Sequence, residues 1–196
     1  MPKIKWKGST LLAPVPPVLV TCGNAEKRNV MTVAWTGILS SQPPKTYISV
    51  RPERYSHALI SETREFVINL TTAALIRTAD FVGIRSGRDI DKFKVCNIAT
   101  EPATEVSCPM IVGSPLSIEC RVTEIISLGS HDMFIADIVS VNVNEELIDR
   151  DGKLHLEGCS LAAYAHGDYF ALGKKIGTFG FSVKKKKKRE DRRPSK

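Results

Sequence analysis

A long hydrophobic run is absent from this 196-residue sequence. Its apolar stretches fall far short of the roughly 18 residues that a membrane-spanning helix needs. The first seven residues carry the positive charge of a signal peptide, but Pro14, Pro16 and Pro17 break the apolar stretch that follows them. We therefore expect a cytoplasmic protein without a membrane span.

Closely spaced cysteines are also absent. The five cysteines are scattered and odd in number, and no Cys-x-x-Cys pair occurs, so the sequence predicts neither a metal site nor a disulfide framework. Cys22 and Cys120 lie in apparent strands, where cysteine behaves as a small buried hydrophobic residue. Cys96 and Cys108 lie in loop-like sequence, and a redox role is excluded less firmly for them.

The net charge of +7 is concentrated at one end of the chain. Residues 184–196 hold nine of the 28 basic residues and only two acids, which leaves the remaining sequence near neutral. A like-charge block without apolar periodicity is typical of a disordered tail. We expect one domain over residues 1–183, a disordered basic tail over 184–196, and no specific binding of nucleic acid.

Hydrophobic periodicity predicts about six strands and two short helices. The strands cover residues 18–22, 29–41, 47–50, 65–70, 116–125 and 134–143, the last two forming a long hairpin. The helices cover residues 55–62 and 73–82, the second capped by Thr71 or Thr72 and ended by Gly83. Because the strands follow one another without crossover helices, we predict a mainly β fold, a β-barrel with short helices.

The most informative stretch runs from Asn29 to Pro44 and ends in Gln-Pro-Pro. One face of the expected strand carries Thr32, Ala34 and Thr36, which are small and hydroxylated and make a poor hydrophobic core. A flat ligand could lie on such a face and receive hydrogen bonds from hydroxyls and main-chain N–H groups. The alternative is an ordinary edge strand with threonines facing solvent.

The next segment suits a phosphate group. The strand at 47–50 leads into Arg51-Pro-Glu-Arg-Tyr-Ser56, and two arginines beside a helix N-terminus favour an anion. In this interpretation Ser56 caps the helix, and the alternative is a set of surface charges. A flat ligand with a phosphate suggests flavin mononucleotide (FMN).

Four segments together resemble the flavin reductase-like family, and within it the flavoredoxin-type proteins. They are residues 32–44, 49–56, 86–93 and 166–170, the last followed by Gly173, and the resemblance runs from about residue 15 to 182. It implies a split barrel that binds FMN, usually as a homodimer.

The resemblance also implies which residues contact the cofactor. The strand with Thr32, Val33, Ala34, Trp35 and Thr36 would lie beside the isoalloxazine ring. The remaining expected contacts, mainly to the phosphate and ribityl groups, come from Ser49, Val50, Arg51, Arg54, Ser56 and Lys92. His166 and Tyr169 would lie on the ring or substrate side, although simple packing is equally open for both.

Other histidines and the loop at 85–93 have structural interpretations. His57 is expected to be structural, His131 to be exposed in a hairpin turn, and His155 to pack among apolar residues. In the loop, Asp89 is the expected N-cap of a helical turn. No catalytic side chain is predicted, because FMN would carry the chemistry.

The resemblance implies an oxidoreductase that passes electrons from NAD(P)H or a reduced partner through FMN to flavin, iron or a redox protein. Two forms stay open, a flavin reductase and a flavoredoxin-type electron carrier. The alternative from another class is a non-catalytic flavin- or haem-binding module or a partner-binding β-barrel. A hydrolase has little support, because no Ser/His/Asp set or His-Glu-x-x-His helix is discernible.

Overall fold

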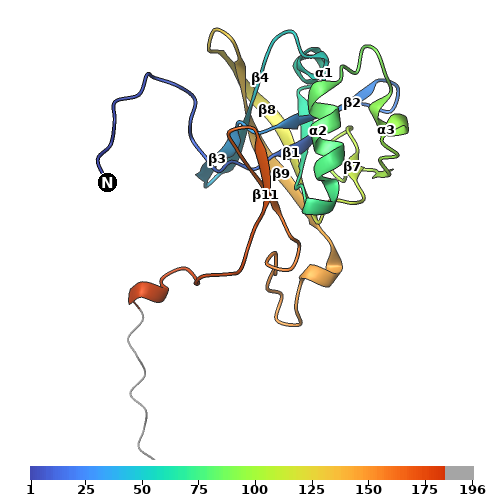
Figure 1. The fold of residues 1–196 in the computed structure, drawn as a ribbon. Helices are drawn as coiled ribbons and strands as arrows, with labels where there is room; N and C mark the ends of the chain where they lie inside the picture. The colour runs from blue at the N-terminus through green and yellow to red at the C-terminus, as the bar shows by residue number, and fades with distance from the viewer. Residues whose placement is uncertain (184–196) are drawn as a thin grey trace, which may run out of the picture.

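A seven-stranded antiparallel sheet forms the centre of the protein, and the computed structural model describes residues 1–183 (Figure 1). The strand order is β2-β1-β5-β8-β9-β4-β3. These strands are β1 (Val18–Gly23), β2 (Arg28–Val33), β3 (Thr36–Ser41), β4 (Pro44–Val50), β5 (Glu65–Asn69), β8 (Leu116–Ser127) and β9 (Asp132–Val143). The mainly β class and the long β8–β9 hairpin are confirmed. The predicted tail, residues 184–196, lies outside the described residues.

Smaller elements surround this sheet. Two further strand pairs are β6 (Thr100–Glu101) with β7 (Met110–Ile111), and β10 (Ala162–Ala165) with β11 (Asp168–Ala171). The helices are α1 (Tyr55–Thr63), α2 (Ile76–Ile84) and α3 (Lys92–Val95), with 3₁₀ turns η1 (Ala73–Leu75), η2 (Glu145–Leu147) and η3 (Phe181–Val183). Within residues 1–183, no helix is both long and apolar enough to cross a membrane.

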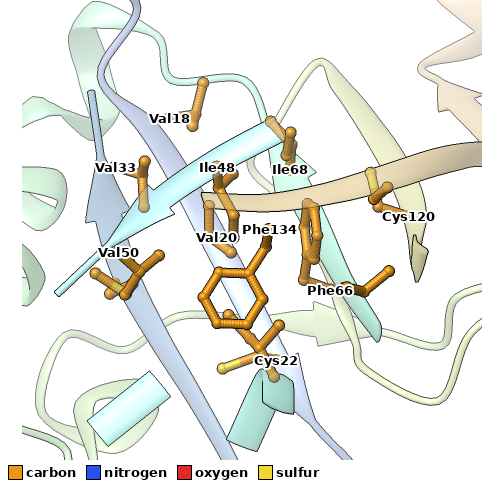
Figure 2. Close-up of a cluster of buried hydrophobic side chains, with 14 of the residues drawn as sticks. Val18, Val20, Cys22, Val33, Ile48, Val50, Phe66, Ile68, Cys120 and Phe134 are labelled. Carbon is orange, nitrogen blue, oxygen red and sulfur yellow. The ribbon is translucent and has the colours of Figure 1, made fainter. Parts of the chain in front are cut away.

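The sheet curls around one hydrophobic core (Figure 2). Phe66 of β5 and Phe134 of β9 are fully buried there together with Ile48 of β4 and Val20 of β1. Side chains from both halves of the sheet therefore meet in one interior, as in a barrel. Cys22 and Cys120 are buried in the same core, as predicted.

A second core lies on the outer face of β1 and β2. Leu19 and Val30 point to this side and pack against Ala79 and Val82 of α2 and Phe93 of α3. Because both of its faces are covered, every residue of β1 is buried. The two helices are thereby held beside the end of β2, where the cavities described below are found.

The prediction of one continuous strand over residues 29–41 is wrong. The chain breaks at Ala34 and Trp35 into β2 and β3, which occupy opposite ends of the strand order. The main-chain N–H of Ser49 donates to the Trp35 carbonyl at 2.9 Å, so the break crosses from one edge of the sheet to the other. Side-chain alternation continues through the crossing and gives no sign of it.

The helix at 55–62 is confirmed as α1, but the expected cap is wrong. Arg54 is the N-cap residue and makes no side-chain capping bond. Ser56 lies within the first turn, only 1% exposed, and accepts a hydrogen bond from the Asn29 amide at 2.8 Å. A short polar residue at the start of a helix pattern can face the protein interior instead of the helix terminus.

Three other helix boundaries also differ from prediction. The 3₁₀ turn η1 precedes α2, and Thr72 makes no side-chain capping bond there. Gly83 does not end α2, which continues to Ile84. The N-cap of α3 is Asp91 and not Asp89, since the Asp91 carboxylate accepts hydrogen bonds from the main-chain N–H groups of Phe93 and Lys94.

Candidate functional site

Two adjoining cavities lie where β2 crosses to β3. The central cavity has a volume of about 380 Å³ and lies between the ends of β2 and β4, helix α2 and the β10–β11 pair. The cationic cavity, of about 360 Å³, lies between the start of α1 and the loop at 85–91. Met31, Arg51 and Arg54 line both, so the two form one continuous depression.

The structure brings most of the predicted cofactor contacts to this depression. The predicted residues that line the central cavity are Thr32, Val33, Ala34, Trp35, Ser49, Val50, Arg51, Arg54 and Tyr169. Ser56 and Lys92 line the cationic cavity with the two arginines. Thr36 and His166 line neither. Residues far apart in sequence thus share one site, although their contact with a cofactor stays a prediction.

The cationic cavity carries a strong excess of positive charge. Among the described residues its lining contains five cations and one acid, Glu53; the cations are Arg51, Arg54, Arg85, Arg88 and Lys92. Arg85 was not predicted, because a single arginine in a loop gives no sequence signal, whereas Arg88 belongs to the segment 86–93 on which the family resemblance rests. Such a surface suits a phosphate dianion.

Local contacts hold the arginines at the rim. The Arg54 guanidinium donates to the Gly83 carbonyl at 3.0 Å, and that of Arg88 donates to the Glu53 carbonyl at 2.8 Å. Arg51 is half-exposed, and its guanidinium lies 3.6 Å from the Glu53 carboxylate. Arg51 therefore has the least engaged guanidinium of the three.

Lys92 forms the floor of the cationic cavity. Its side chain is buried, and Nζ donates to the carbonyls of Val30 at 2.9 Å and Val82 at 2.7 Å. Burial lowers the pKa of Lys92 to about 8, and the nearby charge of Arg54 adds to this effect. An ammonium group has three N–H donors, so one is available to a ligand in the cavity.

Gly87 lets the loop at 85–91 approach β2 and α1. A Cβ atom at this position would lie 2.3 Å from Asn29 Oδ1 and 2.7 Å from Tyr55 Cδ1. Any larger residue would push the loop outward. The close approach sets the width of the cationic cavity and explains physically why a glycine occurs in this segment.

The threonine hydroxyls of the crossing strand have protein partners. Thr32 Oγ1 donates to the Ala79 carbonyl, and Thr36 Oγ1 donates to the Tyr47 carbonyl at 2.6 Å. A hydroxyl has one proton to donate, so these two are already engaged. The main-chain N–H groups around Ala34 are thus the better candidates for donors to a flat ligand.

His131 is a site residue that the sequence did not reveal. The prediction that it is exposed is wrong: it is half-buried, lines the central cavity and lies against Trp35, with ring centroids 4.5 Å apart. Burial lowers the pKa of His131, and the positive charges of Arg51 and Arg54 lower it further. Only the length of the β8–β9 hairpin brings its tip to this cavity.

Tyr169 and Asp80 form a pair at the wall of the central cavity. The Tyr169 hydroxyl donates to the Asp80 carboxylate at 3.2 Å, and burial and this carboxylate raise the pKa of Tyr169. Its neighbour in the sequence motif, His166, is exposed in the β10–β11 turn in the left-handed conformation, with φ of 51°.

The other two histidines, His57 and His155, line neither cavity and each lies beside a carboxylate. His57 lies 2.8 Å from the Asp132 carboxylate and packs edge-on against Phe134, which confirms a structural role. The apolar packing predicted for His155 is wrong, because it lies 2.7 Å from Asp149 and its pKa is raised by that carboxylate and a second nearby one. Within residues 1–183, no cluster of three or more His, Cys, Asp or Glu side chains could hold a metal ion.

Comparisons with known proteins agree with this architecture. The family model described as flavin reductase like domain matches residues 11–173. The structure of the flavoredoxin of Desulfovibrio vulgaris (Miyazaki F) is 30% identical, with a TM-score of 0.85, and the match covers 93% of this chain and 100% of that one.

Two further proteins extend the comparison. An NADPH-flavin oxidoreductase of Streptomyces viridifaciens is 26% identical over 153 residues, which cover 76% of this chain and 78% of the relative. An FMN-binding protein from Thermus thermophilus shares the fold at 23% identity, with a TM-score of 0.76, over 91% of this chain and 99% of that one. The split-barrel fold is thereby confirmed.

Proposed function

Because the chain belongs to the flavin reductase like domain family and is a flavin-related oxidoreductase, we propose that its flavin is FMN. In this proposal the phosphate occupies the cationic cavity and the isoalloxazine ring the central cavity. The protein would then pass electrons from NAD(P)H or a reduced partner to flavin, iron or a redox protein.

The continuity of the two cavities is the observation that carries this proposal. FMN has a planar ring at one end and a dianionic phosphate at the other. The central cavity offers the face of the β2–β3 crossing, and five cations surround the adjoining one. Arg51 and Arg54 line both cavities, so a ligand that fills both passes between them. Riboflavin would use only the first cavity.

Each part of the site has a distinct task. The Ala34–Trp35 crossing offers main-chain donors to the polar edge of the ring, while Arg51, Ser56 and Lys92 hold the phosphate. Tyr164 and Tyr169 line the central cavity and would shield part of a bound ring from water. Bound FMN would supply the electron-transfer chemistry, and the positive charge of Arg51 and Arg54 would favour its reduced, anionic form.

The test is binding of FMN and riboflavin to the apoprotein. We expect FMN to give a yellow complex and to bind more tightly than riboflavin, with a difference that shrinks as salt is added. A colourless protein that takes up neither flavin would overturn the proposal. It would then favour the alternative of a partner-binding β-barrel.

Two functions remain within the proposal, and anaerobic reduction separates them. Rapid bleaching of the FMN absorbance by NADH or NADPH would identify a flavin reductase. Bleaching only by reduced redox proteins would identify a flavoredoxin-type carrier. A flavin that neither donor reduces would indicate a non-catalytic binding module.

We also propose that the protein is a homodimer in the cytoplasm. The N-terminal arm and the segment after β11 extend from the barrel (Figure 1) and expose large apolar side chains outside the three cavities, among them Trp6, Ile176 and Phe179. A second copy could cover these arms. Light scattering that gives the mass of one chain at micromolar concentration would contradict the dimer.

A further inference from the structure

A third cavity, which we call the apolar cavity, adjoins the central cavity at the β2–β3 crossing. Its volume is about 340 Å³, and it shares Ala34, Trp35 and Ser49 with the central cavity. The remaining walls come from Tyr47 of β4, the β8–β9 hairpin at Leu128 and the N-terminal segment. Trp35 thus belongs to both cavities.

The lining of the apolar cavity is uncharged. Among the described residues that surround it there is no Asp, Glu, Lys, Arg or His, whereas the central and cationic cavities contain several. Its polar side chains carry hydroxyl groups, as at Thr10 and Ser49. A charged ligand would lose its hydration there without gaining an ion pair, so the cavity selects neutral molecules.

Contacts within the protein hold the walls in place. The Ser49–Trp35 main-chain hydrogen bond of 2.9 Å fixes the wall that the two cavities share. Tyr47 Cε1 lies 3.3 Å from where a Cβ of Gly37 would be, so its ring covers a glycine on the neighbouring strand. On the third side, Val15 exchanges two main-chain hydrogen bonds with Tyr164, of 3.0 and 2.8 Å.

We propose that the apolar cavity binds a small uncharged quinone, the substrate class of this protein. The aromatic side chains of Trp35 and Tyr47 suit a flat ring, and the hydroxyls suit its carbonyl oxygens. The role as substrate rests on the proposed function. A quinone takes up two electrons and two protons to become the hydroquinone; a reduced, anionic flavin would supply a hydride, which carries both electrons and one proton, and water would supply the second proton.

The test uses duroquinone and the FMN-saturated protein. Every ring position of duroquinone is substituted, so it does not add to cysteine thiols. Equilibrium dialysis should show that Leu128→Glu weakens duroquinone binding at least tenfold and leaves FMN affinity unchanged. Leu128 is an exposed residue of the hairpin turn, so the barrel should tolerate the substitution.

Two further variants make the test specific. Thr10→Glu places a carboxylate at the same cavity from the exposed N-terminal segment and should also weaken duroquinone binding. Ile148→Glu is the matched control, since Ile148 is exposed and lines none of the three cavities. It should bind duroquinone like the unmodified protein.

The outcomes separate this proposal from the proposed function. Absence of duroquinone binding, or equal binding by the unmodified protein and Leu128→Glu, would overturn the quinone site even if FMN binds. Conversion of a dimer to a monomer by Leu128→Glu would also overturn it, because the cavity would then be an interface between copies. If the protein takes up no FMN but still binds duroquinone in a way that Leu128→Glu weakens, the quinone site would be supported and the assignment of FMN as cofactor would be overturned.

Discussion

The imidazole of His131 lies on the indole of Trp35, with ring centroids 4.5 Å apart and planes inclined by 38°. The two residues come from different parts of the sheet, Trp35 from the β2–β3 crossing and His131 from the β8–β9 turn. Both line the central cavity. The pair joins the hairpin tip to the crossing and places a titratable group beside the proposed flavin ring.

The pKa of His131 should respond to the arginines of the site. Burial and the charges of Arg51 and Arg54 disfavour its protonated form, so it should titrate below its ordinary value. Removing one charge by Arg51→Ala should raise the pKa of His131. The measurement is a pH titration of histidine ring protons by NMR in the apoprotein.

His155 is the internal control for this titration. Its pKa is raised by the carboxylates of Asp149 and Glu157, and it lines none of the three cavities. Arg51→Ala should leave it unchanged. A His131 pKa that is insensitive to Arg51→Ala would show that the guanidinium lies farther from the ring in solution.

Replacement of Arg51 should weaken the binding of FMN more than the binding of riboflavin. A hydrogen bond to a charged group contributes about 1.5–3 kcal/mol, and the half exposure of Arg51 favours the lower end of this range. We therefore expect Arg51→Ala to weaken the binding of FMN roughly tenfold and to change the binding of riboflavin little. Fluorescence titration of each flavin measures both effects.

Arg150→Ala provides the comparison, since Arg150 is exposed and outside the cationic cavity. It should alter neither affinity. Equal weakening of FMN and riboflavin by Arg51→Ala would place the phosphate elsewhere. Arg54, Arg88 and Lys92 would then be the next positions to test.

Many of the helices and strands could be predicted because the sequence patterns that indicate them are local. The alternation along β8 and β9 and the apolar middle of α1 arise from burial of one face, which neighbouring residues in the sequence report directly. The break at Ala34 and Trp35 could not be predicted in this way. Its cause is pairing with β4 on the far edge of the sheet, and side-chain alternation is the same on both sides of the break.

The candidate site likewise contains residues that the sequence could predict and residues that it could not. Arg51, Arg54 and Ser56 are close in sequence, so the proposed anion site could be recognised as a motif. His131, Asp80 and Arg85 reach the cavities through tertiary packing alone. The buried Ser56 shows the limit of motif reasoning, since it does not cap α1 but accepts a hydrogen bond from the amide of Asn29, which is distant in sequence.

Binding of FMN should make Lys92 take up a proton at mildly alkaline pH. In the free protein the pKa of Lys92 is lowered to about 8, so between pH 8 and 9 much of the amine is neutral. A phosphate beside it favours the ammonium form and raises this pKa again. The phosphate itself, with a second pKa near 6, is already a dianion there.

Calorimetry in two buffers of different ionisation enthalpy measures this uptake. We expect up to about one proton per FMN near pH 8.5, none with riboflavin, and none with FMN in Lys92→Met. The variant also removes the bonds to the Val30 and Val82 carbonyls, so its folding must be checked by circular dichroism. Binding heats independent of buffer for the unmodified protein would place the phosphate away from Lys92.

Glu119 should be among the most important polar residues for stability. It is fully buried in β8 and accepts five hydrogen bonds. Thr104 supplies two, from N at 2.9 Å and Oγ1 at 2.6 Å, and the main-chain N–H groups of Glu105 and Val106 supply two more, at 2.6 and 3.1 Å. The Asn142 amide completes the set at 2.6 Å. One carboxylate thereby ties the loop after β6 to the long hairpin.

We expect Glu119→Gln to destabilise the fold by about 2–4 kcal/mol, because the new amide group cannot accept from all these donors. Burial alone would raise the pKa of Glu119, but the hydrogen bonds from Thr104, Glu105 and Asn142 outweigh it and lower that pKa. The carboxylate therefore contributes stability above its unfolded-state pKa, and this contribution is lost as the pH falls through the lowered value.

Urea unfolding at pH 7 and at pH 4 measures both effects. The loss on Glu119→Gln should be larger at pH 7, and FMN affinity at pH 7 should be unchanged because Glu119 lines none of the three cavities. Glu124→Gln is the matched control, an exposed glutamate on the same strand. If both variants lose a similar, small amount of unfolding free energy, water or neighbouring groups must pair with the N–H and hydroxyl donors of residues 104–106 without the buried carboxylate.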